Sequence, residues 1–416
     1  MNNLNKAKIL IAPNAPKSRL SLKISISNQL LTFIIAVLLS LPLATTPSQA
    51  IPFPTNIHEL KTHAVHLNVT RIAVFGKDNR KFISRRKSPI TKKIGILYNQ
   101  RTRTLCTAFC LDKSIIGTAA HCLFGRVGGA RQKLRNFTFS LNHKRRGTTS
   151  HIAGARLNAA DQHVITGSTR LRVRPPIDAT KDWAIIKLAR PVCRNGGLKV
   201  SSMKVPDVIK ASNAKNIYQV AFHRDLKKWQ LAHSQPCKVN RRFGKYRWKT
   251  IRQDFTRSNK LILHHCDTGG ASSGSPLILK TKAGPTIIGI NVGTYIQSKV
   301  LMRNGRVTKK FKPQTVANTG VSASVFNDAI ANLKKARILT DKSSLEVVQT
   351  ALRARTIYAG AIDGTYGALT RVAISEFEKN KGWPITGLPT RRLLAHFKSD
   401  IRTVNTPAMS ESSARP

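Results

Sequence analysis

The chain has 416 residues, of which 71 are Lys or Arg and 18 are Asp or Glu, so its formal net charge is +53. This length exceeds that of one typical domain, and we expect two. Basic residues occur in both halves of the sequence and aromatic residues make up only 6% of it, which argues against the basic and aromatic platform of a specific nucleic-acid-binding protein. We interpret the charge as a solvated cationic surface that adheres to anionic polymers.

The first 50 residues have the pattern of a signal peptide. Five basic residues precede the apolar run of residues 30–44, and Ala50 ends a small-residue motif of the kind that a signal peptidase recognises. We therefore predict cleavage near Ala50 and a periplasmic or secreted protein associated with the cell envelope. The long charged leader leaves an uncleaved N-terminal anchor as the alternative. No later stretch is apolar enough to span a membrane, so we expect no span in the mature chain.

The rest of the chain falls into segments that differ in their pattern of hydrophobic and turn residues. Residues 51–90 contain prolines and a basic cluster without sustained periodicity, which is typical of a pro-segment or linker. Across residues 91–335, short β-branched and aliphatic runs alternate with turn residues, which indicates an all-β barrel or sandwich. Helical spacing follows and predicts a small helical domain at residues 341–400, and residues 401–416 are expected to form a disordered tail.

Six cysteines in a chain that carries an export signal fit three disulfides in an oxidising compartment. Metal binding by cysteine is the weaker interpretation, because the sequence has no C-x-x-C pair.

Three short motifs contain the side chains that a nucleophilic hydrolase needs. His121 lies in GTAAHC directly after an apolar run, Asp182 opens the strand-like DWAIIKL, and Ser273 lies in ASSGSP. A general base must be held by rigid strand ends, and a nucleophilic serine needs a tight loop in which its hydroxyl faces the base and backbone N–H groups converge on the oxyanion. Each motif alone is equally compatible with a structural role. The order along the chain, His then Asp then Ser, differs from that of α/β-hydrolases and subtilisins.

Together the motifs resemble those of the chymotrypsin/trypsin family of serine proteases. The resemblance implies two packed antiparallel β-barrels, the first contributing His121 and Asp182 and the second Ser273. It also implies that His121 is the base, that Asp182 orients its imidazole, that Ser273 is the nucleophile, and that the N–H groups of Ala271 and Ser273 form the oxyanion hole. No metal or organic cofactor is expected. Ala271 departs from the family pattern, which has glycine there, so a differently shaped oxyanion hole in an inactive homologue is the alternative.

The residues before Ser273 resemble a particular branch of this family. The run of residues 266–268, Cys-Asp-Thr, is similar to that of bacterial secreted trypsin-like enzymes related to glutamyl endopeptidases. The resemblance implies disulfides between Cys106 and Cys122, between Cys237 and Cys266, and, by elimination, between Cys110 and Cys193.

Two residues are candidates for the substrate pocket. Asp267 lies six residues before Ser273, where trypsin-like enzymes place the aspartate that pairs with a substrate Arg or Lys. Related bacterial enzymes carry the same Asp-Thr pair without that preference, so basic specificity stays open. Asn291 stands where glutamyl endopeptidases have a histidine, which argues against glutamate specificity. Ser272 stands where the digestive enzymes have the aspartate that binds a freed N-terminus, so removal of residues 51–90 would act by unblocking the site.

Residues 344–397 resemble a peptidoglycan-binding-like three-helix domain. The match includes Leu352, the turn Asp363-Gly364 and Phe377, and it departs at Glu378, where the family favours glutamine. The resemblance implies a partner in peptidoglycan or other anionic envelope polymers.

The sequence therefore predicts a mainly β protein, two antiparallel β-barrels followed by a small three-helix domain, that acts as a secreted serine endopeptidase targeted to the cell envelope. We expect protein or peptide substrates and no specific nucleic-acid partner. A catalytically inactive, cationic envelope-binding protein on a protease scaffold is the alternative from another class.

Overall fold

A computed structural model describes most of the chain, namely residues 60–68, 73–84, 88–124, 134–141, 149–151, 163–168, 170–226, 231–239, 242–303 and 306–404. The predicted signal peptide lies outside the described residues, as do residues 405–416 of the predicted tail. None of the helices within these ranges combines the length and the apolar character that crossing a bilayer requires.

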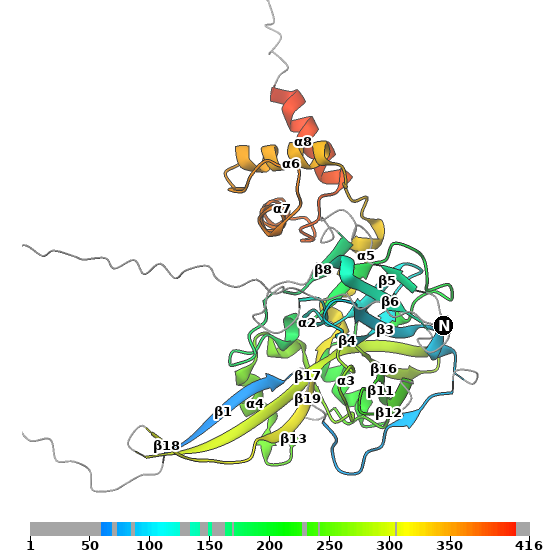
Figure 1. Cartoon of the computed structure of the whole chain (residues 1–416), viewed down its shortest axis with the longest axis vertical. Coiled ribbons are helices and arrows are strands. Elements are labelled where there is room, and N and C mark those ends of the chain that lie inside the picture. The colour runs from blue at the N-terminus through cyan, green and yellow to red at the C-terminus, as the bar shows by residue number, and fades with distance from the viewer. Residues whose placement is uncertain are drawn as a thin grey trace, which may run out of the picture. The chain divides into compact units, whose positions relative to one another are not determined.

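The first sheet of the described chain has seven strands, all paired antiparallel (Figure 1). In spatial order they are β7 (Thr149–His151), β6 (Phe137–Ser140), β3 (Ile94–Asn99), β4 (Leu105–Cys110), β5 (Ile115–Thr118), β9 (Ala184–Lys187) and β8 (Val164–Thr166). Isoleucines dominate β5 and β9, and nearly every residue of both strands is buried, because β-branched side chains pack well on a pleated surface. Their register pairs Thr118 with Ala184, which brings the segments that carry His121 and Asp182 to the same end of the sheet.

The second sheet is larger and is also antiparallel, apart from one parallel pair. Its main path runs through β15 (Leu261–His264), β19 (Gln314–Ser322), β17 (Gly284–Arg303), β16 (Pro276–Thr281), β11 (Ile217–Phe222), β12 (Leu231–Ser234) and β2 (Lys81–Phe82). Three more strands pair with β17: β1 (Leu60–Asn68), β10 (Lys199–Val200) and β18 (Arg306–Lys310). A separate hairpin joins β13 (Arg242–Phe243) to β14 (Tyr246–Arg247). The α-helices of the described chain before the C-terminal module are α2 (His121–Phe124), α3 (Val205–Ser212), α4 (Trp248–Ile251) and α5 (Asn327–Lys335).

Part of the segment that the sequence pattern assigned to a pro-segment or linker is built into the second sheet. Strand β1 pairs with β17 along its whole length, and Figure 1 shows the two side by side. Strand β2 pairs with β12 through Phe82 and Ala232. Residues 60–68 and 81–82 are therefore sheet strands.

The C-terminal module consists of three helices, α6 (Lys342–Ala354), α7 (Ala368–Asn380) and α8 (Arg391–Val404). Leu345, Val348 and Leu352 of α6 pack in one core with Phe377 and Phe397 of the other two helices, as the helical spacing of the sequence predicts. The α8 helix runs into the segment that was expected to form the tail, up to residue 404.

The segment before α6 belongs to this module. Arg391 donates its backbone N–H to Arg337, Leu339 donates to Pro389, and the Leu339 side chain is buried in the module's core. Asp341 then caps α6 by accepting a hydrogen bond from the Ser344 N–H over 2.8 Å. The module therefore begins a few residues before the boundary that the sequence pattern suggests.

Glu378, the departure from the family pattern, is buried and accepts three hydrogen bonds. Its carboxylate binds the backbone N–H groups of Thr386 and Gly387 and the Thr386 hydroxyl. Because a carboxylate has two acceptor oxygens and a glutamine only one, glutamate suits this loop. The mainly β architecture, two antiparallel sheets followed by a small three-helix domain, confirms the predicted fold class.

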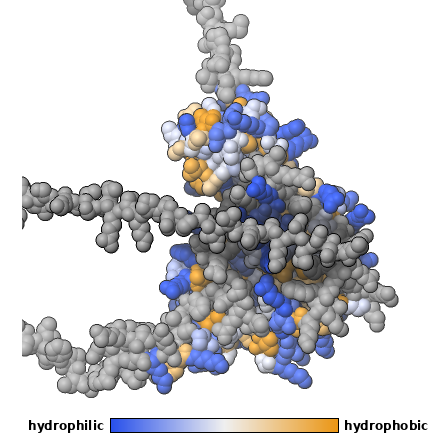
Figure 2. All heavy atoms as spheres, viewed as in Figure 1, coloured by the Kyte–Doolittle hydropathy of each residue, from blue (hydrophilic) through white to orange (hydrophobic). Residues whose placement is uncertain are grey.

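Hydrophilic residues predominate among the coloured areas of the face shown in Figure 2, with smaller hydrophobic areas between them. Among the described residues, the large hydrophobic side chains with the greatest exposure are Leu369, Val372 and Ile385, and all three belong to the C-terminal module.

Candidate active site

His121 and Asp182 meet at the end of the first sheet. Asp182 is fully buried and accepts two hydrogen bonds from His121: one from the backbone N–H over 2.9 Å and one from the ring Nδ1 over 2.6 Å. Since an ionised carboxylate can only accept, this contact fits the tautomer in which Nδ1 carries the proton and Nε2 keeps its lone pair. This tautomer is the one that a general base requires.

The turn before Asp182 is fixed by a second carboxylate. Asp178 precedes the 3-10 turn η5 (Ala179–Lys181) and binds the Arg172 backbone and guanidinium, the Lys181 ammonium and the Thr256 hydroxyl. Burial opposes ionisation of Asp178, but these donors outweigh it and lower its pKa to about 2. The turn that leads to Asp182 is therefore held in place by the Asp178 side chain.

The loop that carries Ser273 is held against the first sheet. The backbone N–H of Thr107 donates to the Ser273 carbonyl over 2.9 Å, and the Thr118 hydroxyl donates to the Thr107 carbonyl over the same distance. A Cβ on Gly274 would overlap both that carbonyl and the Thr118 hydroxyl. The loop that carries Ser273 and the strand end just before His121 are thus in direct contact, and only glycine fits at position 274.

Ala271 adopts the conformation for which the family keeps a glycine. Its φ is +76°, in the left-handed region, where an L-alanine is less stable than glycine. The Thr107 hydroxyl donates to the Ala271 carbonyl over 2.8 Å and accepts the Phe222 N–H over 3.0 Å. Thr107 therefore fixes the orientation of the peptide that follows Ala271.

The two neighbouring serines have other surroundings. Ser275 is fully buried, and its hydroxyl accepts a hydrogen bond from the Gln219 amide over 2.7 Å. The Ser272 carbonyl accepts the side-chain amide of Asn291 over 3.2 Å. The Ser275 hydroxyl is thus occupied by Gln219, and the Ser272 backbone is held by Asn291.

Asn291, one of the two pocket candidates, contacts the loop that carries Ser273. Its backbone N–H donates to Ser275, its carbonyl accepts from Gly274, and its side-chain oxygen lies 3.1 Å from the His264 Nε2. Burial lowers the His264 pKa to about 3, so this ring is neutral and Nε2 donates to Asn291. The Asn291 amide is therefore used to support the loop.

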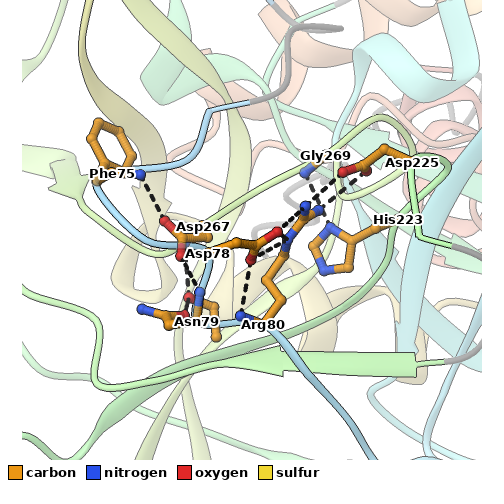
Figure 3. Close-up of polar contacts among 9 residues, drawn as sticks. Phe75, Asp78, Asn79, Arg80, His223, Asp225, Asp267 and Gly269 are labelled. Atoms are coloured by element: carbon orange, nitrogen blue, oxygen red, sulfur yellow. Dashed lines mark hydrogen bonds and ion pairs between the residues drawn. The ribbon is translucent and has the colours of Figure 1, made fainter.

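Asp267, the other pocket candidate, is completely buried and contacts the N-terminal part of the chain (Figure 3). One carboxylate oxygen accepts the Phe75 backbone N–H and the other the Asn79 backbone N–H, both over 2.9 Å. Its own backbone N–H donates to Ser234, whose hydroxyl donates to the Asn79 side chain. Both oxygens of this carboxylate already bind backbone donors.

The six cysteines form the three pairs that the resemblance implied. Their Cα atoms are 6.1 Å apart in Cys106–Cys122, 5.9 Å in Cys110–Cys193 and 4.6 Å in Cys237–Cys266. The first pair ties β4 to the helix that begins at His121. His121 lies close to both sulfurs of this pair, but disulfide sulfurs are not the thiolates that bind metals.

Several residues around the site were not found by sequence reasoning: Thr107, Asp178, Arg80, His223 and Asp225. No motif marks them: Asp178 combines contacts to nearby Arg172 and Lys181 with one to distant Thr256, and the other four contact distant parts of the chain.

Comparison with family models agrees with the geometry. The trypsin model matches residues 83–301, which is more than half of the chain, and the model of a peptidoglycan binding domain matches residues 341–396. No curated protein matches the sequence. The relation to glutamyl endopeptidases stays a prediction. The chain belongs to the trypsin family and carries a peptidoglycan binding domain at its C-terminal end.

Proposed function

We propose that this protein is a secreted serine endopeptidase that acts at the cell envelope with Ser273 as nucleophile, His121 as base and Asp182 as the orienting acid. The observation that carries the proposal is the 2.6 Å contact between the His121 Nδ1 and the buried Asp182 carboxylate. It holds the tautomer in which Nε2 accepts a proton, at the strand end against which the Ser273 loop packs.

In the proposed reaction, the Ser273 hydroxyl oxygen attacks the carbonyl carbon of the scissile peptide bond while His121 Nε2 takes its proton. The tetrahedral intermediate then collapses, the C–N bond breaks, and His121 gives the proton to the leaving amine. A water molecule attacks the acyl-enzyme, His121 takes a proton from that water and returns it to the Ser273 oxygen. Asp182 stabilises the imidazolium that forms in each half of the reaction.

The N–H groups of Ala271 and Ser273 are the proposed donors to the oxyanion. Support comes from the left-handed backbone of Ala271 and from the hydrogen bond that Thr107 makes to the Ala271 carbonyl. Preorganised donors of this kind are effective because they need no rearrangement as the charge develops.

The proposed substrate is a peptide without a required basic residue at the cleaved bond. A cationic side chain would need the Asp267 carboxylate, but both of its oxygens accept backbone N–H groups from residues 75 and 79. Because the carboxylate is completely buried and each oxygen already binds a backbone donor from the N-terminal part of the chain, a substrate cation would have to compete with these hydrogen bonds.

The C-terminal module is the proposed anchor to the wall. The family match at residues 341–396 and the net charge of +53 support contact with peptidoglycan or other anionic envelope polymers. The exposed hydrophobic side chains Leu369, Val372 and Ile385 of this module are candidates for that contact.

The test is cleavage of a peptide library by the secreted chain, compared with Ser273→Ala and with Ser275→Ala as the matched control. Ser273→Ala should lower kcat by orders of magnitude because the members of a triad act as a unit. Ser275→Ala should retain most of the activity, since that hydroxyl binds Gln219. Undiminished cleavage by Ser273→Ala would refute the assignment and point to Ser272 or Ser275, whereas no cleavage by the wild-type chain would favour the inactive, envelope-binding alternative.

A further inference from the structure

The segment of residues 73–82, here called the N-terminal strap, pairs with Thr268 at its start and ends in strand β2 of the second sheet. Ala73 and Thr268 exchange two backbone hydrogen bonds, of 3.0 and 2.9 Å. Asp267 accepts two further N–H groups from the strap, at Phe75 and Asn79. The strap thus binds Asp267 and Thr268 directly, and these two residues begin the segment that leads to Ser273.

The strap also places a buried cation, Arg80, beside Gly269, the residue after Thr268. The Arg80 side chain is 3% exposed, and its guanidinium binds both oxygens of Asp225, over 3.1 and 2.6 Å, and both oxygens of Asp78 (Figure 3). A Cβ on Gly269 would overlap the Asp225 carboxylate and would lie 2.7 Å from the Arg80 Nη1. The backbone of the loop therefore packs directly on the ion pair.

A neutral histidine completes the contact. The Gly269 N–H donates to the His223 Nδ1 over 3.0 Å, and the Gly270 carbonyl accepts the N–H of Arg224. Burial, and then the nearby Arg80 charge, lower the His223 pKa to about 3, so Nδ1 keeps its lone pair for this bond. With the Thr107 contact at Ala271, every residue from 267 to 271 is held by a partner from elsewhere in the chain.

We propose that the N-terminal strap stays in the active enzyme and holds the nucleophile loop in its oxyanion-binding conformation, with the Arg80–Asp225 ion pair as the main support. This inference rests on the proposed protease function. In place of Ser272 the digestive enzymes have an aspartate that binds a freed N-terminus, and here an internal arginine supplies the cation. The enzyme is then active without a new N-terminus, and Arg80 is a positioning residue.

The test uses the full secreted chain with Arg80→Met, Arg80→Lys and Asp225→Asn. Lys81→Met is the matched control, because it removes a neighbouring exposed charge from the same segment and leaves Asp225 paired. For each variant, kcat and KM on a cleaved peptide are measured with the Ki of a peptide aldehyde, whose hemiacetal oxygen occupies the oxyanion hole.

Arg80→Met should lower kcat by about 10- to 100-fold, approaching the loss of an oxyanion donor, with KM changed by less than about threefold. The aldehyde Ki should rise by the same factor as kcat falls. Arg80→Lys should lie between the wild type and Arg80→Met, because lysine keeps the charge but lacks the planar fork that bridges two carboxylates. Lys81→Met should match the wild type.

A purely structural role would lower the melting temperature and leave kcat and the aldehyde Ki of the folded enzyme unchanged, which would overturn the proposal. If Arg80→Met does not fold, Asp225→Asn and Arg80→Lys must show the parallel change in kcat and Ki, or the proposal is wrong. A fully active mature enzyme from which intact mass shows residues 73–82 to be missing would also refute it. The proposed function is judged separately by Ser273→Ala, whose loss of activity is expected even if the Arg80 variants behave as wild type.

Discussion

Thr107→Val removes one buried hydroxyl and leaves the shape of the side chain nearly unchanged. The hydroxyl accepts the Phe222 N–H over 3.0 Å and donates to the Ala271 carbonyl over 2.8 Å, and Thr107 itself is fully buried. Valine satisfies neither group, and each buried backbone group left unpaired costs about 1–3 kcal/mol. We therefore expect the free energy of unfolding to fall by about 2–5 kcal/mol.

The same substitution should lower catalysis, because the peptide between Ala271 and Ser272 loses its contact, and a rotation of that peptide also turns the two neighbouring peptides, which carry the proposed donor N–H groups of Ala271 and Ser273. Complete loss of one oxyanion donor lowers kcat by about 10²–10³, and a misdirected donor should cost part of that, about 10- to 100-fold, with little change in KM. Thr107→Ser is the control, since it keeps the hydroxyl. Denaturant unfolding gives the stability, and initial rates on a soluble peptide give kcat and KM.

A Thr107→Val enzyme with wild-type stability and wild-type kcat would show that the hydroxyl holds neither backbone group in solution. A loss of stability with unchanged kcat would show that the Ala271 peptide keeps its orientation without Thr107, and the proposed support of the oxyanion hole would be wrong.

Three further predictions follow from single contacts. Ala271→Gly should raise the free energy of unfolding by about 0.5–1 kcal/mol because it relieves a left-handed alanine at φ +76°, and an unchanged or lower denaturation midpoint would contradict this. Burial lowers the pKa of His223 to about 3 in the folded chain. Below about pH 6.5 the unfolded chain therefore binds a proton at this residue and the folded chain does not, so the free energy of unfolding falls by about 1.4 kcal/mol per pH unit as the pH decreases. His223→Asn keeps an acceptor for Gly269 but cannot titrate, so its stability measured from pH 6.5 to 4 should fall less steeply than that of the wild type; equal slopes would exclude the assigned pKa. A chain that ends at Ala336 should cleave soluble peptide with nearly unchanged kcat/KM and lose retention on sacculi washed at high salt, whereas a cut after Leu339 would leave a buried module residue without its core. Tight binding of the shorter chain to washed sacculi would show that the module is not the anchor.

The residues of the candidate site differ in how far the sequence could identify them. His121, Asp182 and Ser273 each lie in a local motif, and the three motifs in this order resemble those of one protease family, so the sequence could name them as candidates. The fold class was likewise predictable, because short β-branched runs and a later helical spacing are local properties of the chain.

The supporting residues could not be found in this way. Phe75 is 192 residues from Asp267, and Arg80 is 145 residues from Asp225, so no periodicity or spacing connects them. The low regularity of residues 51–90 suggested a pro-segment or linker, but tertiary pairing places β1 and β2 in the second sheet. Asp267 is an example of what the sequence could not predict. Its position suggested a contact with the substrate, and only the folded structure shows that its carboxylate binds the backbone N–H groups of Phe75 and Asn79.

The central claim is that Ser273 is an activated nucleophile, and its most direct test is labelling of the full secreted chain with a fluorophosphonate probe followed by peptide mapping. We expect one labelled serine, Ser273, and strongly reduced labelling in His121→Ala and Asp182→Asn, because an unactivated serine hydroxyl does not react at a comparable rate. No labelling of the folded wild-type chain, or labelling at Ser272 or Ser275, would contradict it.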